Sequence, residues 1–122
     1  MFSKTPNEIT QLKSKKAIEA LFNEGTHLRK KNLKLVCVVK KTGGLTLGFG
    51  VSKRLFPKAV DRNFIKRIMR EQFKKLRANK DYVIFSGSGF FVFEGKELPT
   101  LESLEKPMQD LVSNWRGEGE AT

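Results

Sequence analysis

Basic side chains at helical spacing are the residues of this sequence with the clearest capacity for chemistry. From Ala59 to Glu71 the chain reads AVDRNFIKRIMRE. At 3.6 residues per turn, six cations and one amide of this segment and its continuation fall within an arc of about 140°: Arg62, Asn63, Lys66, Arg67, Arg70, Lys74 and Arg77. Lys and Arg at i, i+4 repel each other by about 0.2–0.5 kcal/mol per pair, so this face costs stability unless a polyanion offsets the repulsion. The chemistry that it indicates is the binding of phosphate groups.

The opposite side of the same helix is apolar, so we expect it to face a core. Its members are Val60, Phe64, Ile65, Ile68, Met69 and Leu76, with Phe73 at the border. Arg outnumbers Lys at the start of the helix, which suits bidentate contacts with phosphates. Three further cations precede it: Lys53, Arg54 and Lys58. A merely solubilising basic face is the alternative interpretation, but the cations are concentrated rather than interspersed with acids.

Residues that could form a protein-borne active site are sparse. His27 is the single histidine, and we expect it in a surface turn. The single Cys37 lies in an apolar stretch and is expected to be a buried, inert thiol. No Cys/His pair has metal-ligand spacing, so the sequence predicts no structural zinc. Five acidic residues of the C-terminal third show no organised motif and are interpreted as a solvated face: Glu94, Glu97, Glu102, Glu105 and Asp110.

Two glycine-containing segments are interpreted structurally. Gly87-Ser88-Gly89 lacks the spacing of a phosphate-binding loop, so it predicts a turn. Gly48 and Gly50 lie inside a predicted strand and indicate a bulge or a close approach of other atoms to the backbone.

The net charge of +11 is unevenly distributed. Residues 28–80 hold seventeen Lys and Arg against two acidic residues, whereas residues 81–122 hold three basic and eight acidic residues. Such a block favours a phosphate-rich partner and salt-sensitive association. Nucleic acid is favoured over a membrane surface, because the basic helix is expected to bury its apolar face in a core. No apolar run approaches the roughly 18 residues of a membrane span, and no signal peptide is visible, so we expect a cytoplasmic protein.

The pattern of apolar residues predicts an α+β fold, an α/β sandwich in which about three helices pack on a mixed four-stranded sheet. We expect a single RNA-binding domain over residues 1–122, with 1–10 and 117–122 flexible. The predicted elements are a helix over Lys13–Asn23, a hairpin of strands Leu33–Lys40 and Leu45–Ser52, a long helix from Pro57 to about Ala78, a strand over Asp81–Phe85, an edge strand over Phe90–Phe93, and a short helix over Pro107–Arg116.

The basic helix and the residues before it resemble the signature of the bacterial ribonuclease P protein component. That family carries an Arg-Asn-x-x-Lys-Arg-x-x-Arg-Glu helix after a Val-Ser-Lys-Lys strand end. Here the helix motif is Arg62-Asn63, Lys66-Arg67 and Arg70-Glu71, and Val51-Ser52-Lys53-Arg54 precedes it. The likeness extends outward to Leu12–Gly25, which is similar to the family's first helix. It also includes Asp81-Tyr82-Val83-Ile84, which resembles the strand that follows the basic helix.

The resemblance implies a small basic subunit that pairs with the catalytic ribonuclease P RNA. The complex hydrolyses one phosphodiester in precursor tRNA and removes the 5′ leader, with Mg²⁺ held mainly by the RNA subunit. The protein is then expected to carry no catalytic residue, metal ligand or small-molecule cofactor, and to bind no membrane. The resemblance also implies a left-handed crossover through the basic helix between parallel strands, against the usual right-handed rule.

Carried over by position, the resemblance assigns two groups of contacts. The catalytic RNA would be bound by Lys53, Arg54, Lys58, Arg62, Asn63, Lys66, Arg67 and Arg70. The leader would be bound by Ile18, Phe22, Lys34 and Val36. The family often has aromatic residues where Ile18 and Val36 stand, so we expect weaker stacking on the leader here, with Phe22 responsible for more of it.

Two alternative functions remain open from the sequence. A ribosomal or RNA-chaperone protein could use the same helix to clamp RNA without a role in cleavage. A DNA-binding architectural protein is less favoured, because neither a helix-turn-helix nor a wedge-bearing arm is visible.

Overall fold

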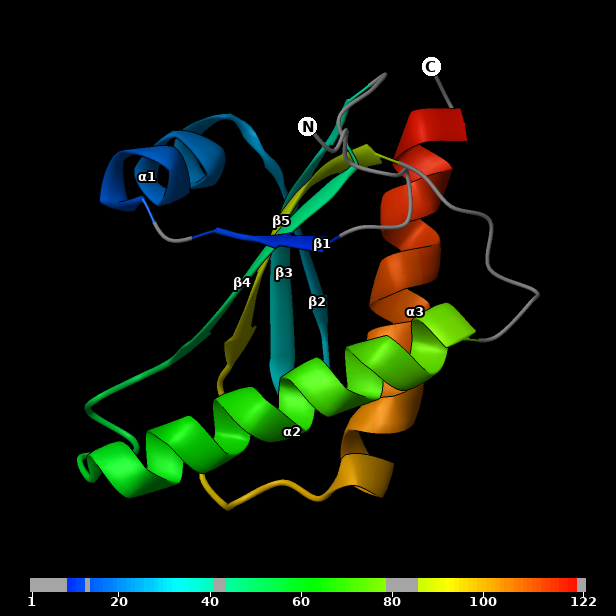
Figure 1. The fold of residues 1–122 in the computed structure, drawn as a ribbon. Coiled ribbons are helices and arrows are strands. Elements are labelled where there is room, and N and C mark those ends of the chain that lie inside the picture. Colours follow the sequence, from blue (N-terminus) through cyan, green and yellow to red (C-terminus); the bar gives the residue numbers. More distant parts are fainter. Residues whose placement is uncertain (1–8, 13, 41–43, 79–85, 121–122) are drawn as a thin grey trace, which may run out of the picture.

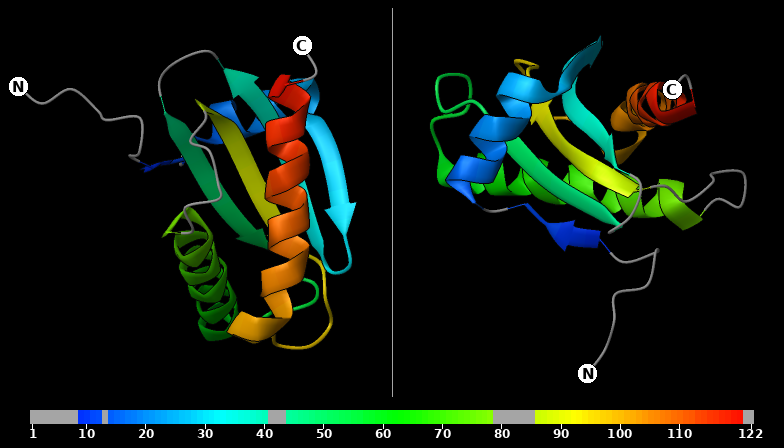
Figure 2. Two further views of the ribbon diagram at one scale, coloured as in Figure 1. Left: turned by 90° about the vertical axis from the view of Figure 1, so that its right-hand side faces the viewer. Right: turned by 90° about the horizontal axis from the view of Figure 1, so that it is seen from above.

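The fold is a five-stranded mixed sheet with α1 on one face and with α2 and α3 on the other (Figure 1, Figure 2). The computed structural model describes residues 9–12, 14–40, 44–78 and 86–120. In chain order the elements are β1 (Ile9–Gln11), α1 (Lys15–Glu24), β2 (Thr26–Lys30), β3 (Leu33–Lys40), β4 (Leu45–Val51), α2 (Ala59–Ala78), β5 (Ser86–Phe93) and α3 (Leu101–Glu120).

The strand order is β1-β4-β5-β3-β2. The pairs β1–β4 and β4–β5 are parallel, whereas β2–β3 and β3–β5 are antiparallel. Because β4 and β5 are parallel neighbours joined through α2, the chain makes a crossover connection through the basic helix. The predicted fold class is confirmed, with five strands in the sheet instead of four.

One face of the sheet forms the hydrophobic core with α2 and α3. Phe91 of β5 is fully buried there and packs against Phe73 of α2, with 6.0 Å between the ring centroids. Trp115 of α3 is also fully buried, and its Nε1 donates to the Val38 carbonyl at 3.0 Å. The buried Gln72 side chain donates to the Leu101 carbonyl at 2.7 Å, which fixes α2 to the start of α3. The basic helix is therefore anchored to both the sheet and the last helix.

The predicted hairpin is wrong, although both of its strands exist. β5 lies between β3 and β4, so that Leu35 and Phe49 are both register partners of Phe91. Local turn residues suggested direct pairing, but a strand from much later in the chain occupies the position between the two.

β5 itself is longer and more central than predicted, because two glycines that suggested a turn serve packing instead. A Cβ added at Gly89 would lie 2.7 Å from the Trp115 ring, and one added at Gly87 would collide with the Val38 carbonyl. Gly87-Ser88-Gly89 is therefore not a turn. It is the part of β5 against which α3 packs closely.

Three other boundaries differ from the prediction. His27 lies in β2, a polar edge strand whose exposed residues show no apolar alternation. Residues Ile9–Gln11 form β1, although residues 1–10 were expected to be flexible. The last helix begins at Leu101, with Pro107 inside it, because Thr100 and Ser103 exchange hydrogen bonds at its start. The helices predicted at Lys13–Asn23 and Pro57–Ala78 agree with α1 and α2 to within two residues at each end.

The assignment of faces on α2 needs one correction. Val60 was expected in the core, but its side chain is 75% exposed. On the helix it lies about 140° from the fully buried Ile65, next to the cationic arc. The strand predicted over Asp81–Phe85 and the terminal segments 1–8 and 121–122 lie outside the described residues.

Candidate RNA interface

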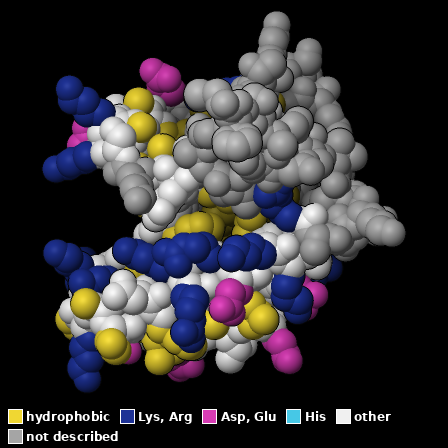
Figure 3. Space-filling model, in the orientation of Figure 1, with side chains coloured by type: hydrophobic (Ala, Val, Ile, Leu, Met, Phe, Trp, Pro, Cys, Tyr) yellow, Lys and Arg dark blue, Asp and Glu magenta, His cyan; other side chains and the backbone are white. Residues whose placement is uncertain are grey.

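The first component of the site is the basic face of α2, which we define as Asn63, Lys66, Arg67, Arg70 and Lys74. These side chains are exposed or half-buried, whereas Ile65 and Met69 on the opposite side are fully buried. Figure 3 shows Lys and Arg in a row along α2, beside a hollow with hydrophobic side chains at its bottom. The predicted separation of one cationic side from one core side is confirmed.

The charges of this face are not neutralised by neighbouring acids. Among the described residues, the ion pairs are Arg29–Glu94 at 3.2 Å and Lys30–Asp110 at 3.7 Å, and neither involves α2. Desolvation by burial lowers the pKa of Arg77 near the end of α2, but a guanidinium stays charged in proteins. The face therefore presents uncompensated positive charge to a polyanion.

Arg62 has a structural task in addition to its charge. Its Nη1 donates to the carbonyls of Phe56 and Pro57 at 2.9 and 2.8 Å. These bonds fix the β4–α2 loop, in which Lys53, Arg54 and Lys58 are exposed. Because Nη1 makes both bonds, Nε and Nη2 of Arg62 can still donate to a phosphate.

Two guanidinium groups of the basic face lie over aromatic rings. The Cζ atom of Arg67 is 5.5 Å from the Phe64 ring centroid, and that of Arg70 is 5.9 Å from the Phe49 centroid. Both distances are within the range of cation–π attraction. These contacts limit the freedom of the two side chains, so less entropy is lost when they bind a ligand.

The second component is on the opposite face of the sheet, next to α1. We call it the aromatic face and define it as Ile18, Phe22, Lys34 and Phe90. The ring of Phe90 lies on the backbone of β4, since a Cβ added at Gly48 or Gly50 would be 2.5 or 2.7 Å from it. The close approach predicted for these two glycines is confirmed, and its cause is the Phe90 ring.

Phe22 of α1 completes this face. Its ring meets Phe90 edge-on, with centroids 5.6 Å apart, and the Lys34 ammonium lies 5.7 Å from its centroid. The His27 Nε2 atom is 2.9 Å from the Phe22 carbonyl, which ties the end of α1 to β2. Ile18 and Phe22 line a shallow groove on α1 together with Glu19 and Asn23.

The four residues that the resemblance assigned to the leader differ in their exposure to solvent. Ile18, Phe22 and Lys34 are partly exposed, but Val36 has no exposed surface. A ligand cannot touch Val36 in this conformation. Its assignment as a direct contact with the leader is therefore wrong, and Val36 instead supports α1 from beneath. The sequence did not lead us to assign Phe90 to this site. The pattern that could have indicated its role is the pair of glycines two residues apart on one face of the neighbouring strand.

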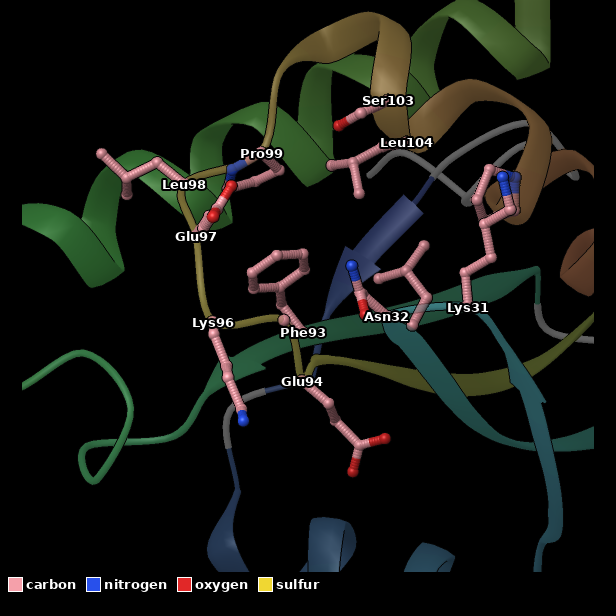
Figure 4. A pocket seen from close by; sticks show the side chains of 13 residues that line it. Lys31, Asn32, Phe93, Glu94, Lys96, Glu97, Leu98, Pro99, Ser103 and Leu104 are labelled. Carbon is pink, nitrogen blue, oxygen red and sulfur yellow. The ribbon is translucent and has the colours of Figure 1, made fainter.

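A larger hollow lies elsewhere, between the β2–β3 turn and the β5–α3 loop (Figure 4). Its volume is about 470 Å³, and its charged lining residues are Lys31, Lys96, Glu94 and Glu97. Because two acids balance two bases, this hollow is a poorer match for a polyanion than the basic face of α2.

The residues that the structure describes form neither a metal-ligand cluster nor a membrane-spanning helix. No group of three or more His, Cys, Asp and Glu side chains there could hold a metal ion. No helix in the described part of the chain is both long and apolar enough to cross a membrane.

The α+β fold combines a mixed sheet, a cationic helix without ion pairs among the described residues and a separate aromatic face, an arrangement suited to a polyanion. The family model described as Ribonuclease P matches residues 7–112. Since this match covers most of the 122 residues, the chain belongs to the Ribonuclease P protein family. No curated protein matches the sequence.

Solved structures agree with this fold. The RNase P protein from Staphylococcus aureus is 21% identical, with a TM-score of 0.70 over 84% of this chain and 92% of that one. The RNase P protein from Thermotoga maritima is 20% identical, with a TM-score of 0.71 over 85% of this chain and 96% of that one. At these identities the likeness establishes the shared architecture, and the family match supplies the classification.

Proposed function

We propose that this protein is the protein subunit of ribonuclease P, which binds the catalytic RNA and the 5′ leader of precursor tRNA to promote removal of the leader. The observation that carries the proposal is the uncompensated basic face of α2, in a chain that belongs to the Ribonuclease P protein family. The result of the reaction would be a tRNA with a mature 5′ end.

The catalytic RNA is assigned to the basic face and the loop before it. The contacts would be Lys53, Arg54, Lys58, Arg62, Asn63, Lys66, Arg67 and Arg70. Each neutralised phosphate releases counterions, with a slope in log K against log salt of about −0.7 to −0.9 per contact. Binding is therefore expected to weaken steeply as salt rises.

The leader is assigned to the aromatic face. Phe22 and Phe90 offer ring surfaces to unpaired bases, Ile18 adds apolar contact, and the Lys34 ammonium can attract the backbone. Stacking of a base on an aromatic ring is worth about 1–3 kcal/mol and tolerates any base sequence. This property suits leaders that differ from one tRNA to the next.

The chemistry of cleavage is assigned to the RNA. When bound, Mg²⁺ held mainly by the RNA would supply the electrostatic stabilisation that phosphodiester hydrolysis needs. Among the described residues no three or more His, Cys, Asp and Glu side chains gather to hold a metal ion by themselves, so the proposal assigns the metal mainly to the RNA. Its cations reduce repulsion between the two RNAs, and its aromatic face orients the leader.

Reconstitution tests this function. The full chain is mixed with a bacterial ribonuclease P RNA at low Mg²⁺ and supplied with precursor tRNA. Stimulated cleavage at the mature 5′ end is the expected result. Binding without stimulation would contradict the proposal in favour of an RNA chaperone or ribosomal protein, and tighter binding to duplex DNA than to structured RNA would favour an architectural DNA-binding protein.

A further inference from the structure

A small hollow lies between β1 and α2, at the edge of the sheet and apart from the aromatic face. Its volume is about 210 Å³, and it is lined by Gln11, Leu47, Phe49, Arg70, Phe73 and Lys74. β1 pairs with β4 only as far as Leu47, so the edge of β4 next to Phe49 has no neighbour from β1. The hollow is therefore open beside the Phe49 ring, and it adjoins the basic face.

Two planar groups line this hollow, Phe49 and Arg70, and the ring of Phe91 backs Phe49 from the core. Phe91 is fully buried, and Phe49 stacks on it with centroids 5.8 Å apart and an angle of 10° between the rings. The exposed Arg70 places its guanidinium carbon 5.9 Å from the Phe49 centroid. The three groups follow one another from the core to the surface, so a planar cation next to rigid rings is presented to solvent.

The rim and the interior of the hollow differ in chemistry. Leu47 and Phe73 are only 2% exposed and form an apolar interior. Arg70, Lys74 and Gln11 are exposed at the rim, where two cations and one amide can meet phosphates and the polar edge of a base. This combination of a flat apolar surface, positive charge and one donor-acceptor group fits a nucleotide.

We propose that this hollow receives one unpaired base of the RNA that docks on α2, with the base stacked against the Arg70–Phe49 pair. The inference rests on the proposed function, because that function supplies the RNA. The volume is below the range of about 300–1,000 Å³ typical of drug-sized ligands, so it suits a single base. A paired base is excluded, since its faces are covered by its neighbours in the duplex. Arg70 then stacks on the base in addition to supplying a positive charge.

The test compares Arg70→Lys with the matched control Arg67→Lys. Both variants keep the charge and lose the planar guanidinium, but Arg67 lies over Phe64 and does not line the hollow. Affinity of the full chain for a bacterial ribonuclease P RNA is measured over a series of KCl concentrations. We expect Arg70→Lys to bind about 5- to 160-fold more weakly than Arg67→Lys, with the same salt slope, as loss of one stacked base requires.

Chemical probing of unpaired bases in the same RNA gives a second readout. One base should be protected by the wild-type protein and by Arg67→Lys, and should become reactive with Arg70→Lys. Equal affinities of the two variants, or a protection pattern that does not depend on Arg70, would overturn the base pocket while cleavage stimulation by the wild type still supports the proposed function. A wild-type protein that does not bind this RNA would overturn both.

Discussion

The basic face of α2 and the aromatic face of the sheet would attract nucleic acid through different physics. The basic face acts on phosphates through charge, which works at a distance and weakens with salt. The aromatic face acts through contact with bases, which needs close fit and depends little on salt. The two faces lie on opposite sides of the sheet, so their contributions can be changed separately. This difference fits the proposed roles, in which α2 would hold the permanent RNA partner and the aromatic face would hold a single-stranded substrate.

The largest expected effect is a difference in stability between a substitution in the core beneath α2 and one on the basic face. Ile65→Ala removes a fully buried side chain of α2 and should lower the free energy of unfolding by about 2–5 kcal/mol. The adjacent Lys66→Ala should change it by no more than about 0.5 kcal/mol, because a surface substitution leaves no cavity. Urea denaturation of both variants measures the difference. Similar losses of stability in both would show that the faces of α2 are wrongly assigned.

A second variant targets the support of the aromatic face. Gly48→Val should push the Phe90 ring off β4, since even a Cβ there would be 2.5 Å from it. Overpacking of this kind costs about 1–3 kcal/mol of stability, and affinity for leader-bearing precursor should fall with it. Thr46→Val is the control, because residue 46 lies two positions away on the same face of β4. If the position of the Phe90 ring on β4 matters, Gly48→Val must lower both the stability and the affinity for the precursor more than Thr46→Val does.

A third comparison tests stacking directly. Phe22→Ala or Phe90→Leu should weaken binding of precursor tRNA to the reconstituted complex by about 1–3 kcal/mol, with the salt slope unchanged. Binding of mature tRNA, which has no leader, should not change. Unaltered affinity for the precursor would show that the leader does not bind to the aromatic face.

The smallest expected effect belongs to one charge of the basic face. Arg67→Ala should reduce the slope of log K against log salt by about 0.7–0.9 for the catalytic RNA, without loss of folding. Lys106→Ala removes the same charge from an exposed position of α3 and should leave the slope as it is. Equal slopes for the two variants would mean that overall charge, and not the basic face, controls binding.

The sequence predicted α2 well because its signal is local. Periodic cations and buried apolar residues mark both its boundaries and its exposed side, and only Val60 was placed on the wrong side. The sheet was predicted poorly because its pairing is not local. Nothing near Gly87 and Gly89 reveals that Trp115 will pack on them, and nothing near β3 and β4 reveals that β5 will lie between them.

The candidate site shows the same division. The cations of α2 and of the preceding loop were predicted from composition, motif and helical spacing. Phe90 was missed, because its role depends on the register between β4 and β5, which places its ring over two glycines. Val36 was assigned by alignment to the leader, and the position of α1 over the sheet buries it.

The central claim is that the basic face of α2 joins this protein to the catalytic RNA and so promotes cleavage. The most direct measurement is the rate of precursor tRNA cleavage by a bacterial ribonuclease P RNA at low Mg²⁺, with the wild type or with Lys66→Gln, Arg67→Gln and Arg70→Gln combined. The wild type should stimulate cleavage at the mature 5′ end, and the folded variant should not do so at the same salt. Equal stimulation by the variant would contradict the claim.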